Sequence, residues 1–190
     1  MATMTAAPRM AVRERSTGSV RREGLVTGLL GAGVVAAFYF LLDLSRGQPL
    51  MTPTVLGDVF VLQQPISNGP DATAIVTYTI LHTLAFILFG LALTVLVRLA
   101  ERSALARYAV VQLMVVFLLF FYGLLMIASE QARGRFPFFG VLVANTIAAG
   151  VMLVWQWRHH PRLVVALRDA PLGASDEASV PARMNHTGLF

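Results

Sequence analysis

The chain has 190 residues, of which 56% are hydrophobic and only 13% are charged, and its formal net charge is +5. Soluble domains carry roughly 25% charged residues, so this composition excludes an ordinary soluble protein, and a chain this apolar is not disordered throughout. The lack of cysteine in the sequence excludes disulfides, thiolate metal sites and thiol redox chemistry. We therefore predict an all-α integral membrane protein.

The N-terminal segment, residues 1–22, is polar and basic, and we predict a disordered cytoplasmic tail there. The apolar stretch that follows covers about 24–44. It ends near Asp43 without the small-residue cleavage site that is typical of a signal peptide. We therefore interpret this stretch as a retained transmembrane helix, the first of four.

The loop that follows, residues 45–72, is long for a compact protein. Thr52 and Pro53 are typical of the N-cap and first position of a helix. Apolar residues with helical spacing come next, from Val55 to Phe60. We predict a short interfacial helix here, which lies on the outer membrane surface or caps the bundle.

Three further apolar stretches cover about 73–97, 108–129 and 137–157. Each has the roughly 20 residues that a membrane-spanning helix needs. Together with the first stretch they predict a four-transmembrane-helix bundle over residues 23–160. The last two stretches are joined by a short connection, so they should form an antiparallel hairpin.

The arginines give the predicted orientation of this bundle. All fifteen basic residues are arginine, and twelve of them precede the first stretch, separate the second from the third, or follow the fourth. Only Arg46, Arg133 and Arg135 fall on the other side. Because cytoplasmic loops carry the excess of positive charge, both termini should be cytoplasmic. This distribution also argues against nucleic acid as a partner, and it leaves the lipid bilayer as the expected one.

The C-terminal segment, residues 161–190, is predicted to be a second cytoplasmic tail. Its first part, 161–168, places apolar residues between arginines, which favours a short interfacial helix. Beyond Pro171 the composition turns to Gly, Ser, Asp, Glu and Pro, and we predict disorder.

Small residues recur every fourth position in the first span, at Gly24, Gly28, Ala32 and Ala36. Small side chains let helix backbones approach closely in lipid, where van der Waals packing drives association. This ridge predicts packing against another span of the same chain. The alternative is contact with a second copy or with a different membrane protein.

Polar residues gather at a similar depth in the four spans. At 1.5 Å per residue, those nearest the middle lie about 3 to 8 Å to the outer side of the centres of their spans. The predicted polar cluster consists of His82, Asn145, Tyr122, Tyr39, Asp43 and Glu130, with Tyr78 beside it. It is typical of a proton or ion pathway, of a quinone or lipid headgroup site, or of a metal site. The alternative is mutual hydrogen bonding that fixes the register of the helices.

A haem would need two histidines at matching depth, but only His82 lies within a span. One histidine with Asp43 and Glu130 would be an improvised ligand set, and its spacing is not diagnostic of a metal site. The sequence also contains no catalytic triad, no phosphate-binding glycine loop and no zincin motif. We therefore predict no cofactor, no metal and no catalytic residues.

Two motifs carry a resemblance to known proteins. Residues 47–57 read GQPLMTPTVLG, and the second span contains His82-Thr83-Leu84-Ala85-Phe86 followed by Gly90. Together they resemble a group of small uncharacterised bacterial four-span proteins, over about residues 24–160. The resemblance implies a four-span fold and a bacterial inner membrane, and it implies no activity.

These observations leave three hypotheses about function. The leading one is a non-catalytic accessory or scaffolding component that acts through helix packing and its outer loop, in a homo-oligomer or a larger membrane complex. The second is a small carrier or channel that uses the polar cluster around His82. The third is a membrane-embedded enzyme that acts on a lipid or a quinone.

Overall fold

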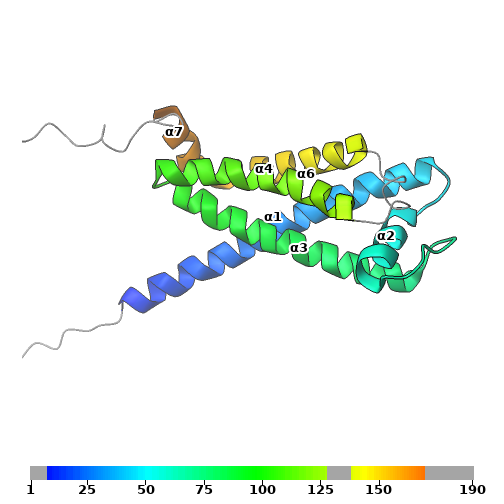
Figure 1. Ribbon diagram of the computed structural model, residues 1–190. Helices are drawn as coiled ribbons and strands as arrows, with labels where there is room; N and C mark the ends of the chain where they lie inside the picture. The colour runs from blue at the N-terminus through cyan, green and yellow to red at the C-terminus, as the bar shows by residue number, and fades with distance from the viewer. Residues whose placement is uncertain (1–7, 128–137, 170–190) are drawn as a thin grey trace, which may run out of the picture.

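The computed structural model describes residues 8–127 and 138–169, and the regular structure in these two ranges is helical (Figure 1). Four long helices run along the molecule, and shorter helices lie at its two ends. The elements are α1 (Pro8–Ser45), α2 (Met51–Leu56), the π-helical turn η1 (Gly57–Leu62), α3 (Ala72–Ala100), α4 (Ala104–Ile127), α6 (Phe138–His159) and α7 (Pro161–Asp169). The all-α prediction is confirmed.

Three of these helices are long and apolar enough to cross a membrane. They are the part of α1 from Ser19 to Ser45, the whole of α3, and α6 from Phe139 onwards. The apolar run found in α4 is shorter and covers Leu105–Phe121. Large apolar side chains such as Leu88 point outwards from the helices. A lipid environment would cover them, and the chain is therefore a helical protein of the integral membrane type.

Helix α1 begins earlier than the sequence predicts. It starts at Pro8, so residues 8–22, for which the composition predicts a disordered tail, continue the helix of the first apolar stretch. Extending an existing helix avoids the cost of nucleation, and the segment is rich in residues with good helix propensity, such as Met, Arg and Glu. At the other end of the chain, α7 occupies the place of the short helix predicted for 161–168. The tails 1–7 and 170–190 lie outside the described residues.

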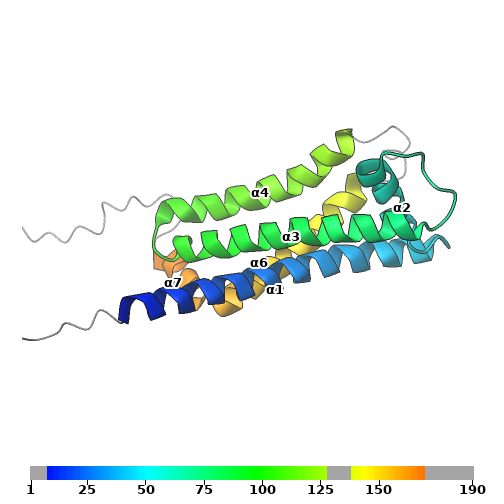
Figure 2. The same ribbon diagram turned by 90° about the horizontal axis from the view of Figure 1, so that it is seen from below.

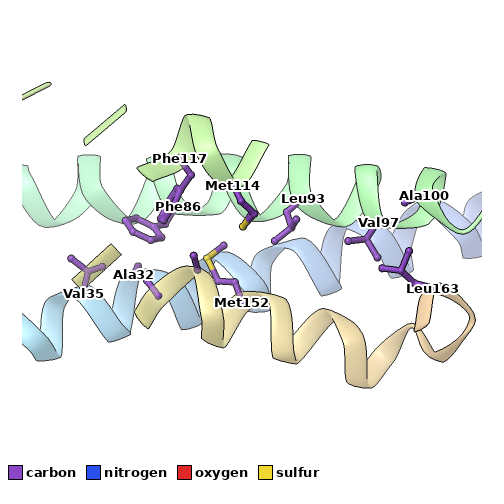
Figure 3. Close-up of a cluster of buried hydrophobic side chains, with 12 residues drawn as sticks. Ala32, Val35, Phe86, Leu93, Val97, Ala100, Met114, Phe117, Met152 and Leu163 are labelled. Atoms are coloured by element: carbon purple, nitrogen blue, oxygen red, sulfur yellow. The ribbon is translucent and has the colours of Figure 1, made fainter. Parts of the chain in front are cut away.

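The core is formed where α1 packs against α3 and α6, while α4 covers α3 from the other side (Figure 2). Figure 3 shows the buried side chains as a row along the bundle, from Val35 at one end to Leu163 at the other. Phe86 of α3 lies towards the Val35 end of this row and Met152 of α6 lies nearer its middle, and both are almost completely buried. The core therefore fixes α1, α3 and α6 relative to one another along most of their length.

The loop of residues 45–72, which we call the outer loop after its predicted side of the membrane, folds over the end of the bundle opposite α7 (Figure 1), and we call this end the α2 end. The predicted short helix of this loop is present. The sequence predicts Thr52 as its N-cap, and this prediction is wrong. The N-cap is Leu50, in a left-handed conformation with φ 64°. Asp43 of α1 provides the side-chain capping instead: its carboxylate accepts hydrogen bonds from the backbone N–H (2.6 Å) and the hydroxyl (2.7 Å) of Thr52. The sequence alone does not reveal that a neighbouring helix supplies this cap.

Two further carboxylates and one glycine fix the rest of the loop. Asp58 is completely buried and accepts hydrogen bonds from the side chain of Gln64 and the backbone N–H of Ser67, both at 2.8 Å. Asp71 caps the N-terminus of α3. Gly57 packs so closely on α3 that a Cβ there would lie 2.8 Å from the Cα of Ala74. The loop is therefore docked on its own bundle through contacts that include two residues of the motif at 47–57, Thr52 and Gly57.

Asp58 should make the stability of this loop depend on pH. Burial alone would raise its pKa, but the hydrogen bonds from Ser67 and Gln64 outweigh burial and hold the pKa below its ordinary value. A depressed pKa contributes stability above the unfolded-state pKa of about 3.9, and this contribution is lost as the pH falls through the folded-state value. We expect Asp58→Asn to unfold at a lower temperature than the wild type at pH 6, with the gap closing towards pH 2. Melting curves of both proteins in a non-ionic detergent measure this, and a gap that does not change with pH would contradict it.

Candidate ligand site

Helices α1 and α3 approach most closely at glycines. A Cβ placed on Gly28 would lie 2.5 Å from both the carbonyl oxygen of Phe86 and the Cα of Ile87. On the other side of the contact, a Cβ on Gly90 would lie 2.5 Å from the backbone nitrogen of Gly28. Gly24 makes a similar contact with Leu91. Two members of the predicted small-residue ridge, Gly24 and Gly28, thus face α3 of the same chain.

The other two members of the ridge differ from each other. Ala32 is buried, and its carbonyl oxygen faces His82 of α3, 3.3 Å from the Nε2 atom. Ala36, one turn further towards the α2 end, is exposed and lines a hollow between α1 and α3. Towards the α2 end, the space between the two helices is therefore lined by side chains such as those of Tyr39 and His82 and is not closed by backbone contact.

His82 lies in this space and faces α1, with only 8% of its surface exposed. Its Nε2 atom contacts the carbonyl of Ala32, and its Nδ1 atom lies 3.4 Å from the hydroxyl of Tyr78. Because a carbonyl only accepts hydrogen bonds, this arrangement assigns the proton to Nε2 and makes Nδ1 an acceptor for Tyr78. A neutral imidazole therefore has partners for both of its ring nitrogens.

Beside His82 lies a cavity of about 310 Å³. Tyr39 of α1, Tyr78 and His82 of α3, and Asn145 of α6 supply its polar groups, and the remaining walls are apolar. Leu56 of α2 and Phe60 of η1 line it as well, so the outer loop forms part of the cavity. Side chains that are distant in sequence thus converge on one mostly apolar site, which is the usual composition of a ligand pocket.

Asn145 is the polar group of this cavity for which the described part of the chain offers no hydrogen-bond partner. The residue is only 3% exposed and lines the cavity. Within residues 8–127 and 138–169, its side-chain amide forms no hydrogen bond. Most buried side-chain amides in folded proteins are hydrogen-bonded. The amide of Asn145 is therefore available to both donors and acceptors of a bound molecule.

A second cavity, of about 540 Å³, lies between α1 and α3 beneath the N-terminal end of α2. It is lined by small residues of α1, among them Gly33 and Ala36, and by Thr79 and Thr83 of α3. Tyr39, Tyr78, His82 and Val35 line both cavities. The bonded pair of Tyr78 and His82 thus forms part of the partition between two hollows.

The structure brings together only part of the predicted polar cluster. His82, Asn145 and Tyr39 surround one cavity, whereas Asp43 bonds to Thr52 and does not line it. Tyr122 belongs to α4, but its side chain is not among those described, and Glu130 falls in the segment 128–137, outside the described residues. Depth along a span could be calculated from the sequence, but the direction of each side chain could not.

A second polar centre, which the sequence alone does not reveal, lies towards the α7 end. Gln156 of α6 is almost completely buried and donates hydrogen bonds to the hydroxyls of Thr27 (2.9 Å) and Thr94 (2.6 Å). Nearby, Arg98 forms a salt bridge with Glu23 at 2.7 Å. The sequence offers one signal for this centre, because Thr27, Thr94 and Gln156 lie at a similar depth in their helices. Because this centre links α1, α3 and α6 through bonds within the chain, we assign it a structural role.

Among the residues that the structure describes, no three histidine, aspartate or glutamate side chains lie close enough to hold a metal ion. No family model, curated protein or solved structure matches the chain. Function is therefore inferred from the geometry of the cavity beside His82.

Proposed function

We propose that the protein is a non-catalytic membrane protein that holds one lipid-soluble molecule in the cavity beside His82. The observation that carries the proposal is the buried amide of Asn145, which lines a cavity of about 310 Å³ and forms no hydrogen bond within the described ranges. An apolar pocket with a few convergent polar groups is the usual form of a small-molecule site. A bound molecule would satisfy the amide and fill the hollow at the same time.

The membrane topology belongs to the same proposal: α4 is a fourth span, both termini are cytoplasmic, and the α2 end faces outwards. Helix α4 has 24 residues, which is roughly 36 Å at 1.5 Å per residue and exceeds a hydrocarbon core of roughly 30 Å. The arginine distribution supports the orientation, and the resemblance at residues 47–57 supports a bacterial inner membrane. Because the chain lacks cysteine, the variants Gly69→Cys and Ser103→Cys allow a test. An impermeant thiol reagent added to intact cells should label the first variant and not the second.

The contacts of the candidate residues favour binding over the other hypotheses. Both ring nitrogens of His82 have partners, and Asp43 bonds to Thr52, so neither group is poised for proton transfer to a substrate. The cavity walls are mostly apolar, which does not favour an ion path. Gly24 and Gly28 pack on α3, and the loop docks on its own bundle. The features that suggested a scaffold are therefore engaged within the chain.

The test is purification from the native membrane in mild detergent, followed by native mass spectrometry. The wild-type protein should retain a small molecule, and Asn145→Leu, which removes the amide at similar size, should lose it. The matched control is Val143→Leu, on an exposed position of the same helix, which should retain the molecule. A wild-type protein that carries no molecule, or an Asn145→Leu variant with wild-type occupancy, would overturn the proposal.

A further inference from the structure

We infer that the bound molecule presents a planar, uncharged ring with a carbonyl group, as a lipid-soluble quinone does, and that the amide of Asn145 donates a hydrogen bond to this carbonyl. This inference rests on the proposed function and adds the chemical class of the ligand. Charge, aromatic character, volume and the position of the opening each support it.

The charge of the site favours a neutral ligand. None of the described residues that line either cavity is Asp, Glu, Lys or Arg. The carboxylate nearest in sequence to the lining residues of α1, Asp43, bonds to Thr52. The bonds of His82 to Ala32 and Tyr78 fit a neutral imidazole. A phosphate or carboxylate head would lie buried here without a counter-charge, which is strongly unfavourable.

The walls favour a flat ring. Aromatic side chains from four elements line the cavity: Tyr39, Phe60, Tyr78, Phe120 and Phe121. Aromatic faces and edges pack well against a planar conjugated ring. The volume of about 310 Å³ lies at the lower end of the roughly 300 to 1,000 Å³ that is typical of ligand pockets. The cavity therefore fits a head group and not a whole lipid with its chains.

The edge of the cavity gives the tail of such a molecule a way out. Leu81 of α3 and Phe120 of α4 both line the cavity, and their exposed fractions are 49% and 56%. In a bilayer these two side chains would face the acyl chains. A ring held beside Asn145 could therefore extend an apolar tail between α3 and α4 into the lipid. The outer loop, through Leu56 and Phe60, lies on another side of the same cavity.

The experiment uses the full chain in nanodiscs made of phosphatidylcholine, to which candidate ligands are added. The probes are a benzoquinone with a short alkyl tail, a short-chain diacylglycerol and phosphatidylglycerol. We expect the benzoquinone to raise the melting temperature in a saturable manner and the other two to have no effect. Loss of one hydrogen bond should weaken the apparent affinity of Asn145→Leu for the benzoquinone about tenfold. Val143→Leu should bind as the wild type does.

A second variant keeps the test valid if Asn145→Leu does not fold. Ala85 lines the cavity without a polar group, so Ala85→Leu should reduce quinone binding by occupying space and leave Asn145 in place. If diacylglycerol or phosphatidylglycerol binds instead, in a manner sensitive to Asn145→Leu, the quinone class is overturned and the proposed function stands. If the native protein carries no molecule and no probe binds, both the quinone class and the proposed function are overturned.

Discussion

Replacing Gly28 by alanine should destabilise the protein by about 3 kcal/mol, since overpacking typically costs 1 to 3 kcal/mol and more where nothing can move aside. The added methyl group would lie 2.5 Å from the carbonyl oxygen of Phe86 and from the Cα of Ile87. These are backbone atoms of α3, so relief requires the two helices to separate. The effect is measured as a change in apparent melting temperature in detergent. The melting is monitored by the loss of the monodisperse peak in size-exclusion chromatography after heating.

Gly33 provides the matched control because it lies on the same helix and a Cβ there would meet no atom within 4 Å beyond the adjacent backbone of its own helix. Gly33→Ala should be neutral or slightly stabilising, by up to about 1 kcal/mol, since alanine has the higher helix propensity. Equal melting temperatures for Gly28→Ala and Gly33→Ala would show that α1 and α3 do not make this close contact. The pair of variants therefore tests the backbone packing that creates the space occupied by His82.

Replacing Asp43 by leucine should release the outer loop from the bundle. The substitution leaves the backbone N–H and the hydroxyl of Thr52, both bonded to the carboxylate, without an acceptor in a buried position. An unsatisfied buried donor costs about 1 to 3 kcal/mol, so we expect a total of roughly 3 kcal/mol. Hydrogen exchange of the peptides that contain α2 and η1 should accelerate well before the long helices are affected.

Asp43→Asn separates the hydrogen bonds from the charge. The asparagine oxygen can accept from the Thr52 N–H while its NH₂ group donates to the Thr52 hydroxyl, so this variant should keep the loop largely protected. If exchange in the loop were as fast in Asp43→Asn as in Asp43→Leu, the hydrogen bonds to Thr52 would not be what holds the loop. Because Leu56 and Phe60 line the cavity beside His82, Asp43→Leu should also weaken retention of the bound molecule.

The sequence predicted the helical class, the positions of the long helices and the presence of a short helix in the outer loop. Each rests on a local property of the chain: the length of an apolar run, its periodicity, or a residue that favours a helix start. The start of α1 at Pro8 and the N-cap at Leu50 differ from the prediction. In both places a neighbouring part of the structure outweighs the local preference: a stable span extends the helix, and a carboxylate of α1 replaces the cap.

The sequence by itself also determined that polar groups occur at one level of the spans, including His82, Asn145 and Tyr39. Only the tertiary structure decided their roles, because the rotation of each helix about its axis depends on packing against the others. The glycines at positions 24, 28 and 90 set how closely α1 and α3 approach, and this contact turns His82 towards Ala32. The same packing directs Asp43 to Thr52, where it caps a helix, and leaves the amide of Asn145 facing a cavity that no single segment of the chain encloses.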